Sequence, residues 1–233
     1  MWKKFRSWPK AGQIGVWVAL GFVALVGLGA VVGGEETTVP APLTSTPQVD
    51  GSVDDSADAP PAPEPTAPAG DTLPGEGTFV VGAEMKPGLW KGKDASGGYW
   101  ATLKNVTGEL GAIVANDNVT SGNAYVQVGG AARYFEANGF TEWVKVPAKP
   151  TGPKARSFSG EGMYMVGVDI APGTYRAKSD GSGYWARLSN ASGELGGIIA
   201  NDNVLSTTTT IVEIRSGDAF FKTSGFDQWT KAG

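Results

Sequence analysis

The chain carries one unit of sequence twice. The phrase GELGAIVANDNV (108–119) returns as GELGGIIANDNV (193–204), at an offset of 85 residues. GEGTFVVGAEMKPGLW matches GEGMYMVGVDIAPGTY at the same offset, and the offset becomes 86 for NGFTEW and SGFDQW. Internal repetition at a fixed period indicates duplicated structural units, so we expect two copies of one small domain. We name them repeat 1 (75–146) and repeat 2 (160–233), joined by a proline-containing linker (147–159).

Each unit has the alternation typical of short β-strands. YWATL and YWARL alternate large apolar residues with small or polar ones, and AYVQV and TIVEI alternate with period two. The sequence therefore predicts an all-β protein, with about six or seven short strands per repeat in a small sandwich or partly open barrel. The segment GDAFFKTSG (217–225) fits either one helical turn or an edge strand, and the one-residue change of offset after Val119 is expected in a loop. Domains this small are marginally stable alone without disulfides, so we expect the two repeats to pack on each other.

The first 34 residues have the pattern of a membrane anchor. Residues 11–34 contain no charge, and a helix that crosses a bilayer needs roughly 20 apolar residues. Four basic residues precede this run and acidic residues follow it, which predicts a cytoplasmic tail (1–10), a single-pass signal anchor and an extracytoplasmic remainder. A cleaved signal peptide is the alternative, because small residues near the end of the run suit cleavage, although its apolar core is longer than the usual 7–15 residues or so.

The segment 35–74 has the composition of a disordered stalk. It is rich in Pro, Ala, Thr and Ser and holds eight acidic residues and no basic one. Such a segment cannot bury enough apolar surface to offset its ordering entropy. Residues 75–233 carry 15 acidic and 15 basic side chains without a basic run, which argues against a nucleic-acid partner.

Two absent residue types narrow the chemistry. The chain has no His and no Cys, so it lacks the commonest general base, thiol catalysis, disulfides and thiolate metal sites. Carboxylates, Lys, Tyr, Ser and Thr are the remaining routes to catalysis. We therefore expect a protein that is not an enzyme and that holds no metal and no cofactor.

A Tyr-Trp dipeptide stands at the same place in both repeats, as Tyr99-Trp100 and Tyr184-Trp185. Successive side chains of a strand point to opposite faces, so one aromatic ring of each pair should be core and the other should lie on the outer face. The outer ring is a candidate platform for stacking on a sugar. Plain packing is the favoured explanation of both rings, because a short domain needs the area that aromatic side chains bury.

An Asn-Asp-Asn triplet is also duplicated. The candidate binding residues are Asn116, Asp117 and Asn118, with Asn201, Asp202 and Asn203. We interpret the triplets as turn residues that end a strand, since Asn and Asp bond to their own backbone in turns. The alternative is a cation or polar-ligand site that includes Glu109 and Glu194, although one Asp and two Asn fall short of the six to eight oxygens that calcium takes. A retaining glycosidase would need two carboxylates about 5 Å apart, and Glu109 with Asp117 is the conceivable pair.

The ordered pattern VGxDIxPGTYRA, GYWARLS, IIANDN and GFxxW resembles a secreted or membrane-anchored β-domain of actinobacteria and their phages. That family has no assigned molecular function, so the resemblance implies location and fold rather than activity. Family members usually carry a Cys before the Tyr-Trp pair and another three residues before the last Trp. Here those places hold Gly98 with Phe140, and Gly183 with Phe226. If the family cysteines form a disulfide, each Phe ring should pack over its Gly in this chain.

These patterns together predict a membrane-anchored, extracytoplasmic protein that binds or adheres at the cell envelope. Its expected partners are the membrane through residues 11–34, and wall glycan or another envelope protein through the repeats. A carboxylate-based hydrolase of envelope glycan is the alternative. A phage-encoded protein that modifies the host surface is a second alternative.

Overall fold

The computed structural model describes residues 70–232, and regular structure in this part of the chain is β-strand apart from two single-turn 3-10 helices. The expected all-β architecture is confirmed. The tail (1–10), the anchor (11–34) and most of the stalk (35–74) lie outside the described residues. Within residues 70–232, no helix has the length and apolar character needed to cross a membrane.

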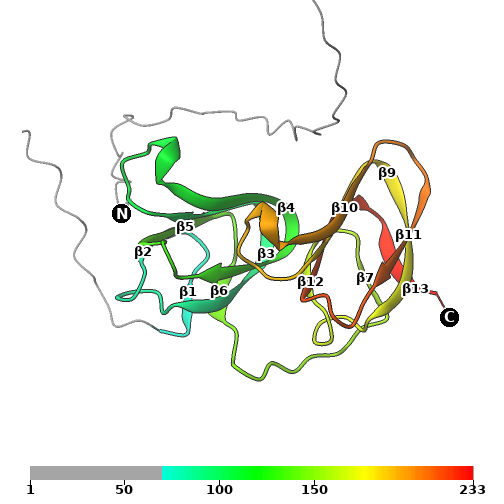
Figure 1. The fold of residues 1–233 in the computed structure, drawn as a ribbon, viewed down its shortest axis with the longest axis horizontal. Coiled ribbons are helices and arrows are strands. Elements are labelled where there is room, and N and C mark those ends of the chain that lie inside the picture. Colours follow the sequence, from blue (N-terminus) through cyan, green and yellow to red (C-terminus); the bar gives the residue numbers. More distant parts are fainter. Residues whose placement is uncertain (1–69, 233) are drawn as a thin grey trace, which may run out of the picture. The chain divides into compact units, whose positions relative to one another are not determined.

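Repeat 1 forms a six-stranded antiparallel sheet, drawn from cyan to green in Figure 1. The order is β1-β6-β3-β5-β2, and β4 also pairs with β3. The short helix η1 (Leu110–Ala112) precedes β4. The strands are β1 (Thr72–Pro74), β2 (Gly77–Val80), β3 (Gly88–Leu103), β4 (Ile113–Val128), β5 (Tyr134–Asn138) and β6 (Glu142–Lys145).

The long strand β3 organises repeat 1. Its first half pairs with β6 through residues 90–93, its second half pairs with β5 through residues 99–103, and β4 follows it over nearly its whole length. The β3–β4 register shifts between Gly92 and Ala95, where Asp94 adopts a positive φ of 48°. Such a bulge bends a strand and increases its twist, so one strand can serve three neighbours and close the sheet into a barrel-like form.

Repeat 2 forms a seven-stranded sheet of the same order, β7-β13-β9-β12-β8, drawn from yellow to red in Figure 1. In it, the equivalent of β4 is divided into two strands separated by residues 205–208. The short helix η2 (Leu195–Gly197) precedes the first of them. The strands are β7 (Ser157–Ser159), β8 (Gly162–Met165), β9 (Gly173–Leu188), β10 (Ile198–Val204), β11 (Thr209–Ile214), β12 (Phe220–Phe226) and β13 (Gln228–Lys231).

Three details differ from the sequence-based expectation. The additional residue of repeat 2 lies in the loop between β10 and β11, as expected. In repeat 1 there is no loop at the equivalent position, because β4 continues through it, opposite the bulge in β3. Residues 217–225 are neither a helical turn nor an edge strand, since β12 lies between β9 and β8. Strands β1 and β7 begin before Gly75 and Gly160, so the ends of the expected stalk and linker belong to the repeats. A three-residue strand is too short to show periodicity in the sequence.

Each repeat has an aromatic core built from equivalent residues. Phe135 meets Trp143 edge-on at 4.8 Å between ring centroids in repeat 1, and Phe221 meets Trp229 edge-on at 5.3 Å in repeat 2. All four side chains are fully buried. Edge-to-face pairs at this spacing add to the stabilisation that area burial supplies.

The expected packing of Phe over Gly is confirmed in both repeats. A Cβ placed on Gly98 would lie 2.9 Å from Cε2 of Phe140, and one on Gly183 would lie 2.8 Å from Cζ of Phe226. Neither glycine has a positive φ, so the ring, and not the backbone conformation, requires glycine here.

The two repeats pack on each other, as expected from their small size. A separate apolar cluster joins Tyr125 of repeat 1 to Met163, Met165, Ala191 and Phe220 of repeat 2, and all five are buried. Both repeats belong to one compact unit. The interface therefore acts as a third core between two domains that are marginal alone.

Candidate functional site

The predicted site residues lie side by side on paired strands. In repeat 1, Tyr99 pairs with Asn118 and Trp100 pairs with Asp117 across β3 and β4. The second repeat reproduces this register on β9 and β10, where Asp202 pairs with Trp185. The interpretation of the Asn-Asp-Asn triplets as strand-ending turns is therefore wrong. Each triplet continues its strand, because the neighbouring strand offers a full ladder of backbone partners that local turn chemistry does not outweigh.

Trp is the core member of each Tyr-Trp pair. Trp100 is 2 % exposed, and Trp185 is partly buried against the core of repeat 2. Tyr99 and Tyr184 are half-buried. Burial raises the pKa of each Tyr hydroxyl, and a hydrogen bond with Asn116 or Asn201 opposes that shift. The outer ring is thus the Tyr in both repeats, and its role as a stacking platform stays a prediction.

Asp117 is engaged by a lysine of the other repeat. Lys222 Nζ donates to both carboxylate oxygens of Asp117 at 2.6 Å, and both side chains are mostly buried. Asp202, its equivalent in repeat 2, is exposed. Within residues 70–232, no group of three or more acidic side chains stands close enough together to hold a metal ion.

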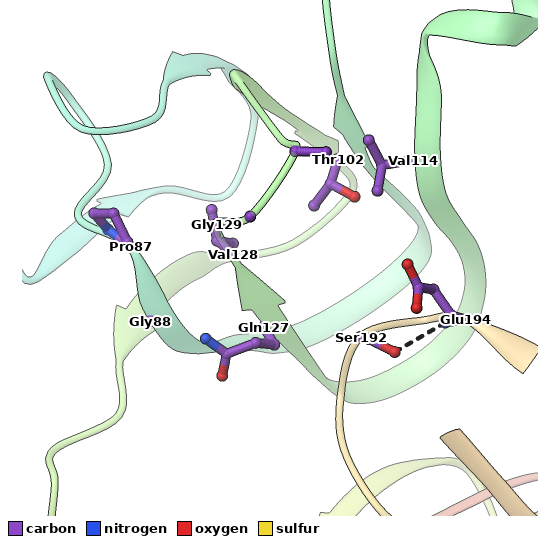
Figure 2. A pocket seen from close by; sticks show the side chains of 11 residues that line it. Pro87, Gly88, Thr102, Val114, Gln127, Val128, Gly129, Ser192 and Glu194 are labelled. Carbon is purple, nitrogen blue, oxygen red and sulfur yellow. Dashed lines mark hydrogen bonds between the residues drawn. The ribbon is translucent and has the colours of Figure 1, made fainter. Parts of the chain in front are cut away.

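A cleft of about 570 Å³ lies between repeat 1 and a loop of repeat 2 (Figure 2). Its volume is within the range of small-molecule sites, about 300–1,000 Å³. Most of the lining comes from β3, β4 and the turn that follows β4, and Ser192 and Glu194 complete it from repeat 2. The lining residues are Pro87, Gly88, Thr102, Val114, Gln127, Val128, Gly129, Gly130, Ala131, Ser192 and Glu194.

The loop of repeat 2 that completes the cleft is held on repeat 1 by its backbone. The N–H of Gln127 donates to the carbonyl oxygen of Ala191 at 2.7 Å. Gly193 adopts a φ of +77°, and a Cβ there would lie 2.8 Å from Cη2 of Trp100. The N–H of Glu194 donates to Ser192 Oγ at 3.2 Å, the contact drawn in Figure 2. The cleft wall is therefore a docked loop, and the small size of Gly193 permits the docking.

Repeat 2 holds a buried ion pair at two positions whose equivalents in repeat 1 are small and uncharged. Arg187 Nε and Nη2 donate to Asp218 at 2.7 and 2.8 Å, and the side chains are 11 and 3 % exposed. In repeat 1 the equivalent positions hold Thr102, which lines the cleft, and Ala132, which follows the lining residue Ala131.

Burial opposes ionisation of Asp218, but hydrogen bonds from Arg187 and from the N–H of Arg215, with the two guanidinium charges, outweigh it and lower its pKa. The carboxylate is therefore the form that the folded state stabilises. No equivalent acid lies at this place in repeat 1, where Ala132 stands.

The lining of the cleft combines one acidic side chain with neutral polar and apolar ones. Glu194 is the one acidic side chain among its lining residues, and Gln127 and Ser192 supply an amide and a hydroxyl group. Pro87 and Val114 supply apolar surface, whereas Thr102 and Val128 are buried beneath the cleft and the Thr102 hydroxyl donates to the carbonyl oxygen of Ala115. A mixture of apolar walls with a few polar groups is typical of ligand sites.

Of the residues named from the sequence, Glu194 lines this cleft, whereas the Tyr-Trp pairs and the Asn-Asp-Asn triplets do not. Glu194 is named there together with the Asn-Asp-Asn triplets, and the structure places it against repeat 1 instead. The sequence could not indicate this contribution of Ser192 and Glu194, since it depends on how repeat 2 docks.

A family model described as the Rv1352-like extracellular domain matches the chain twice, over residues 71–144 and 156–230. These bounds agree with the strands β1 to β6 and β7 to β13 to within a few residues. No curated protein and no solved structure matches the chain significantly.

Proposed function

The chain belongs to the Rv1352-like extracellular domain family, and we propose that it is a membrane-anchored, non-catalytic binding protein of the cell envelope. The repeats are extracytoplasmic domains, as the family description states. The apolar run 11–34 would anchor them, and the acidic segment 35–69 would hold them off the membrane as a stalk.

The observation that carries the proposal is the cleft walled by both repeats. Duplication alone would give two equivalent surfaces, yet the wall of this cleft combines β3 and β4 of repeat 1 with Ser192 and Glu194 of repeat 2. Because Glu194 closes it from the second repeat, the site depends on the tandem arrangement. That dependence supports a binding role for the docked pair rather than for a single repeat.

The chemistry of the lining favours a hydroxyl- and amide-bearing ligand, which is the chemistry of wall glycan. The carboxylate of Glu194 and the amide of Gln127 can accept hydrogen bonds from sugar hydroxyls. Pro87 and Val114, which are at least partly exposed, offer apolar surface to the C–H faces of a sugar ring. A hydrolase is less favoured, because glycosidases use two carboxylates flanking the bond and the cleft lining contains one.

The test is retention of the full-length chain, solubilised in mild detergent, on purified cell-wall sacculi. Glu194→Ala should reduce retention on the order of tenfold, which is about 1.4 kcal/mol of binding free energy. Glu109→Ala is the matched control, since Glu109 is the equivalent residue of repeat 1, is exposed and does not line the cleft. The control should bind as the wild type does.

A second variant fills the cleft with the pair that repeat 2 carries. Thr102→Arg combined with Ala132→Asp should preserve the fold, judged by circular dichroism, and abolish retention. Equal retention of Glu194→Ala and wild-type protein would contradict the cleft as the site. Failure of wild-type protein to bind sacculi, with one envelope protein recovered in a Glu194-dependent way, would instead indicate a protein ligand. Release of sugar by the wild type would make it a hydrolase.

A further inference from the structure

Repeat 2 covers one face of repeat 1, and the equivalent face of repeat 2 has nothing over it among the described residues. Tyr125 on the covered face is 3 % exposed. Its equivalent is Ile211, which pairs with Arg176 as Tyr125 pairs with Lys91, and which is 68 % exposed. The same side of the sheet is thus buried in one repeat and open in the other.

Neighbouring positions show the same contrast. Val114, at the cleft, corresponds to Ile199, which is 46 % exposed. Trp100 is buried and corresponds to Trp185, which is partly exposed. We define the free face of repeat 2 by Ile199, Asp202 and Ile211, all of which are exposed. Exposed large apolar residues at positions whose equivalents are covered by a neighbouring domain mark an interaction site.

The interface inside the chain shows which chemistry fits such a face. Lys222 of repeat 2 bonds Asp117 of repeat 1 at 2.6 Å. Lys91 of repeat 1 bonds Asp169 of repeat 2 at 3.1 Å, and the hydroxyl of Tyr125 donates to the same carboxylate at 2.6 Å. In one ion pair the lysine comes from repeat 2, and in the other it comes from repeat 1. The two pairs together fix the orientation in which repeat 2 docks on repeat 1.

A second copy docked in the same way would meet one repulsive contact. Strand register makes Asp202 the equivalent of Asp117, and Glu136 the equivalent of Lys222. Glu136 of the incoming repeat 1 would then face Asp202, acid against acid. Like charges brought together at an interface repel each other and suppress wrong partners.

The second ion pair would again join a basic and an acidic residue. Arg176 and Glu84 are the equivalents of Lys91 and Asp169. Glu84 even makes the same local bond, accepting the N–H of Val80 at 2.7 Å as Asp169 accepts the corresponding N–H of repeat 2 at 2.8 Å. Apart from Glu136, each residue of the two ion pairs is replaced by one of the same charge. The free face of repeat 2 therefore carries the same charges as the face of repeat 1 that repeat 2 covers.

We propose that the free face of repeat 2 is a docking surface for another β-domain of this fold that carries a basic residue where Lys222 stands, and that Glu136 and Asp202 exclude this chain's own first repeat. The partner is defined by its chemistry: an apolar sheet face with a cation placed to meet Asp202. A second wild-type copy does not meet that definition.

Sedimentation equilibrium of the full-length chain in density-matched detergent tests the proposal. Glu136→Lys turns repeat 1 into a surrogate partner, and Asp202→Lys supplies the cation from the other side. Each single variant should self-associate at least about tenfold more tightly than wild type, and wild type mixed with the Glu136→Lys chain should form the same complex. The double variant, with Lys on both sides, should return to the wild-type state.

Two controls keep the result specific. Glu142→Lys makes the same charge change on β6. Its equivalent in repeat 2, Gln228, is exposed and therefore not buried between the repeats, so the Glu142→Lys chain should not self-associate. Ile211→Glu added to Glu136→Lys should dissociate the complex. Single variants that sediment like wild type would overturn the proposal, as would association of the double variant equal to that of the singles. Misfolding does not mimic the expected pattern, because combining two damaging changes would not cancel their effects.

Discussion

At the residue scale, the repeats differ most where one of them buries charge. Arg187 and Asp218 form a bidentate pair inside repeat 2, whereas Thr102 and Ala132 stand in repeat 1. Removal of one partner of a buried ion pair strongly lowers the stability of the fold, because the other charge is left desolvated and unpaired. Replacement of both partners by neutral residues costs much less. Repeat 1 shows that the same fold forms with small neutral residues at these two positions.

We therefore expect Arg187→Thr alone to lower the free energy of unfolding by about 3–5 kcal/mol, and Arg187→Thr with Asp218→Ala to cost clearly less. Urea denaturation of the three proteins at neutral pH measures both values. A double variant less stable than the single one would contradict the account.

The same pair predicts a pH dependence. The pKa of Asp218 is lowered in the folded state from an ordinary value of 3.8, so its contribution is present above pH 3.8 and is lost as the pH falls through the folded pKa. The stability difference between wild type and the double variant should shrink on acidification from neutral to about pH 2. A difference that stays constant over this range would show that Asp218 is not preferentially ionised in the folded protein.

At the scale of the element, the loop before η2 has a role that its counterpart before η1 does not share. Both loops contain a glycine of nearly equal backbone geometry, with φ of +79° at Gly108 and +77° at Gly193. A Cβ on Gly108 would meet nothing within 4 Å, whereas one on Gly193 would meet Trp100 and Ala115. The first loop ends in solvent and the second docks on the neighbouring repeat.

Alanine at these two glycines separates backbone strain from docking. Gly108→Ala should cost about 1 kcal/mol from the left-handed conformation alone. Gly193→Ala should cost that amount and a further 1–3 kcal/mol or so, because the added methyl overpacks against Trp100. Chemical denaturation gives both values, and equal losses would mean that the loop is not tightly seated.

At the scale of the whole described unit, the two repeats share one interface and should unfold together. The pair between Asp117 and Lys222, the hydroxyl of Tyr125 on Asp169 and the apolar cluster around Met165 all join the repeats. Burial raises the pKa of Tyr125, and its bond to Asp169 raises it further, so that hydroxyl remains a donor at any ordinary pH. Cooperative unfolding follows when an interface contributes much of the stability of two small domains.

Lys222→Glu should uncouple the repeats, since it places a second acid against Asp117. Differential scanning calorimetry should then resolve two transitions where wild type has one, with the earlier one lowered by about 4–8 °C for each kcal/mol lost, as for a domain of this size. Asp117→Lys combined with Lys222→Glu should restore a single transition. One unchanged transition in the Lys222→Glu protein would show that this ion pair does not couple the repeats.

The sequence by itself determined the duplication, the all-β class, the strand content of each repeat and the packing of Phe140 over Gly98. The first three follow from repetition and periodicity in the chain, and the packing of Phe140 over Gly98 is what the family resemblance implies. Tertiary structure decided that Asn-Asp-Asn lies within a strand, that 220–226 is an interior strand, and that Glu194 belongs to a cleft of the other repeat. Which copy of a duplicated surface is covered depends on contacts between residues far apart in the sequence, such as Asp117 and Lys222, which are 105 positions apart. Two copies with nearly the same sequence therefore acquire different surfaces, because only one of them has the other docked upon it.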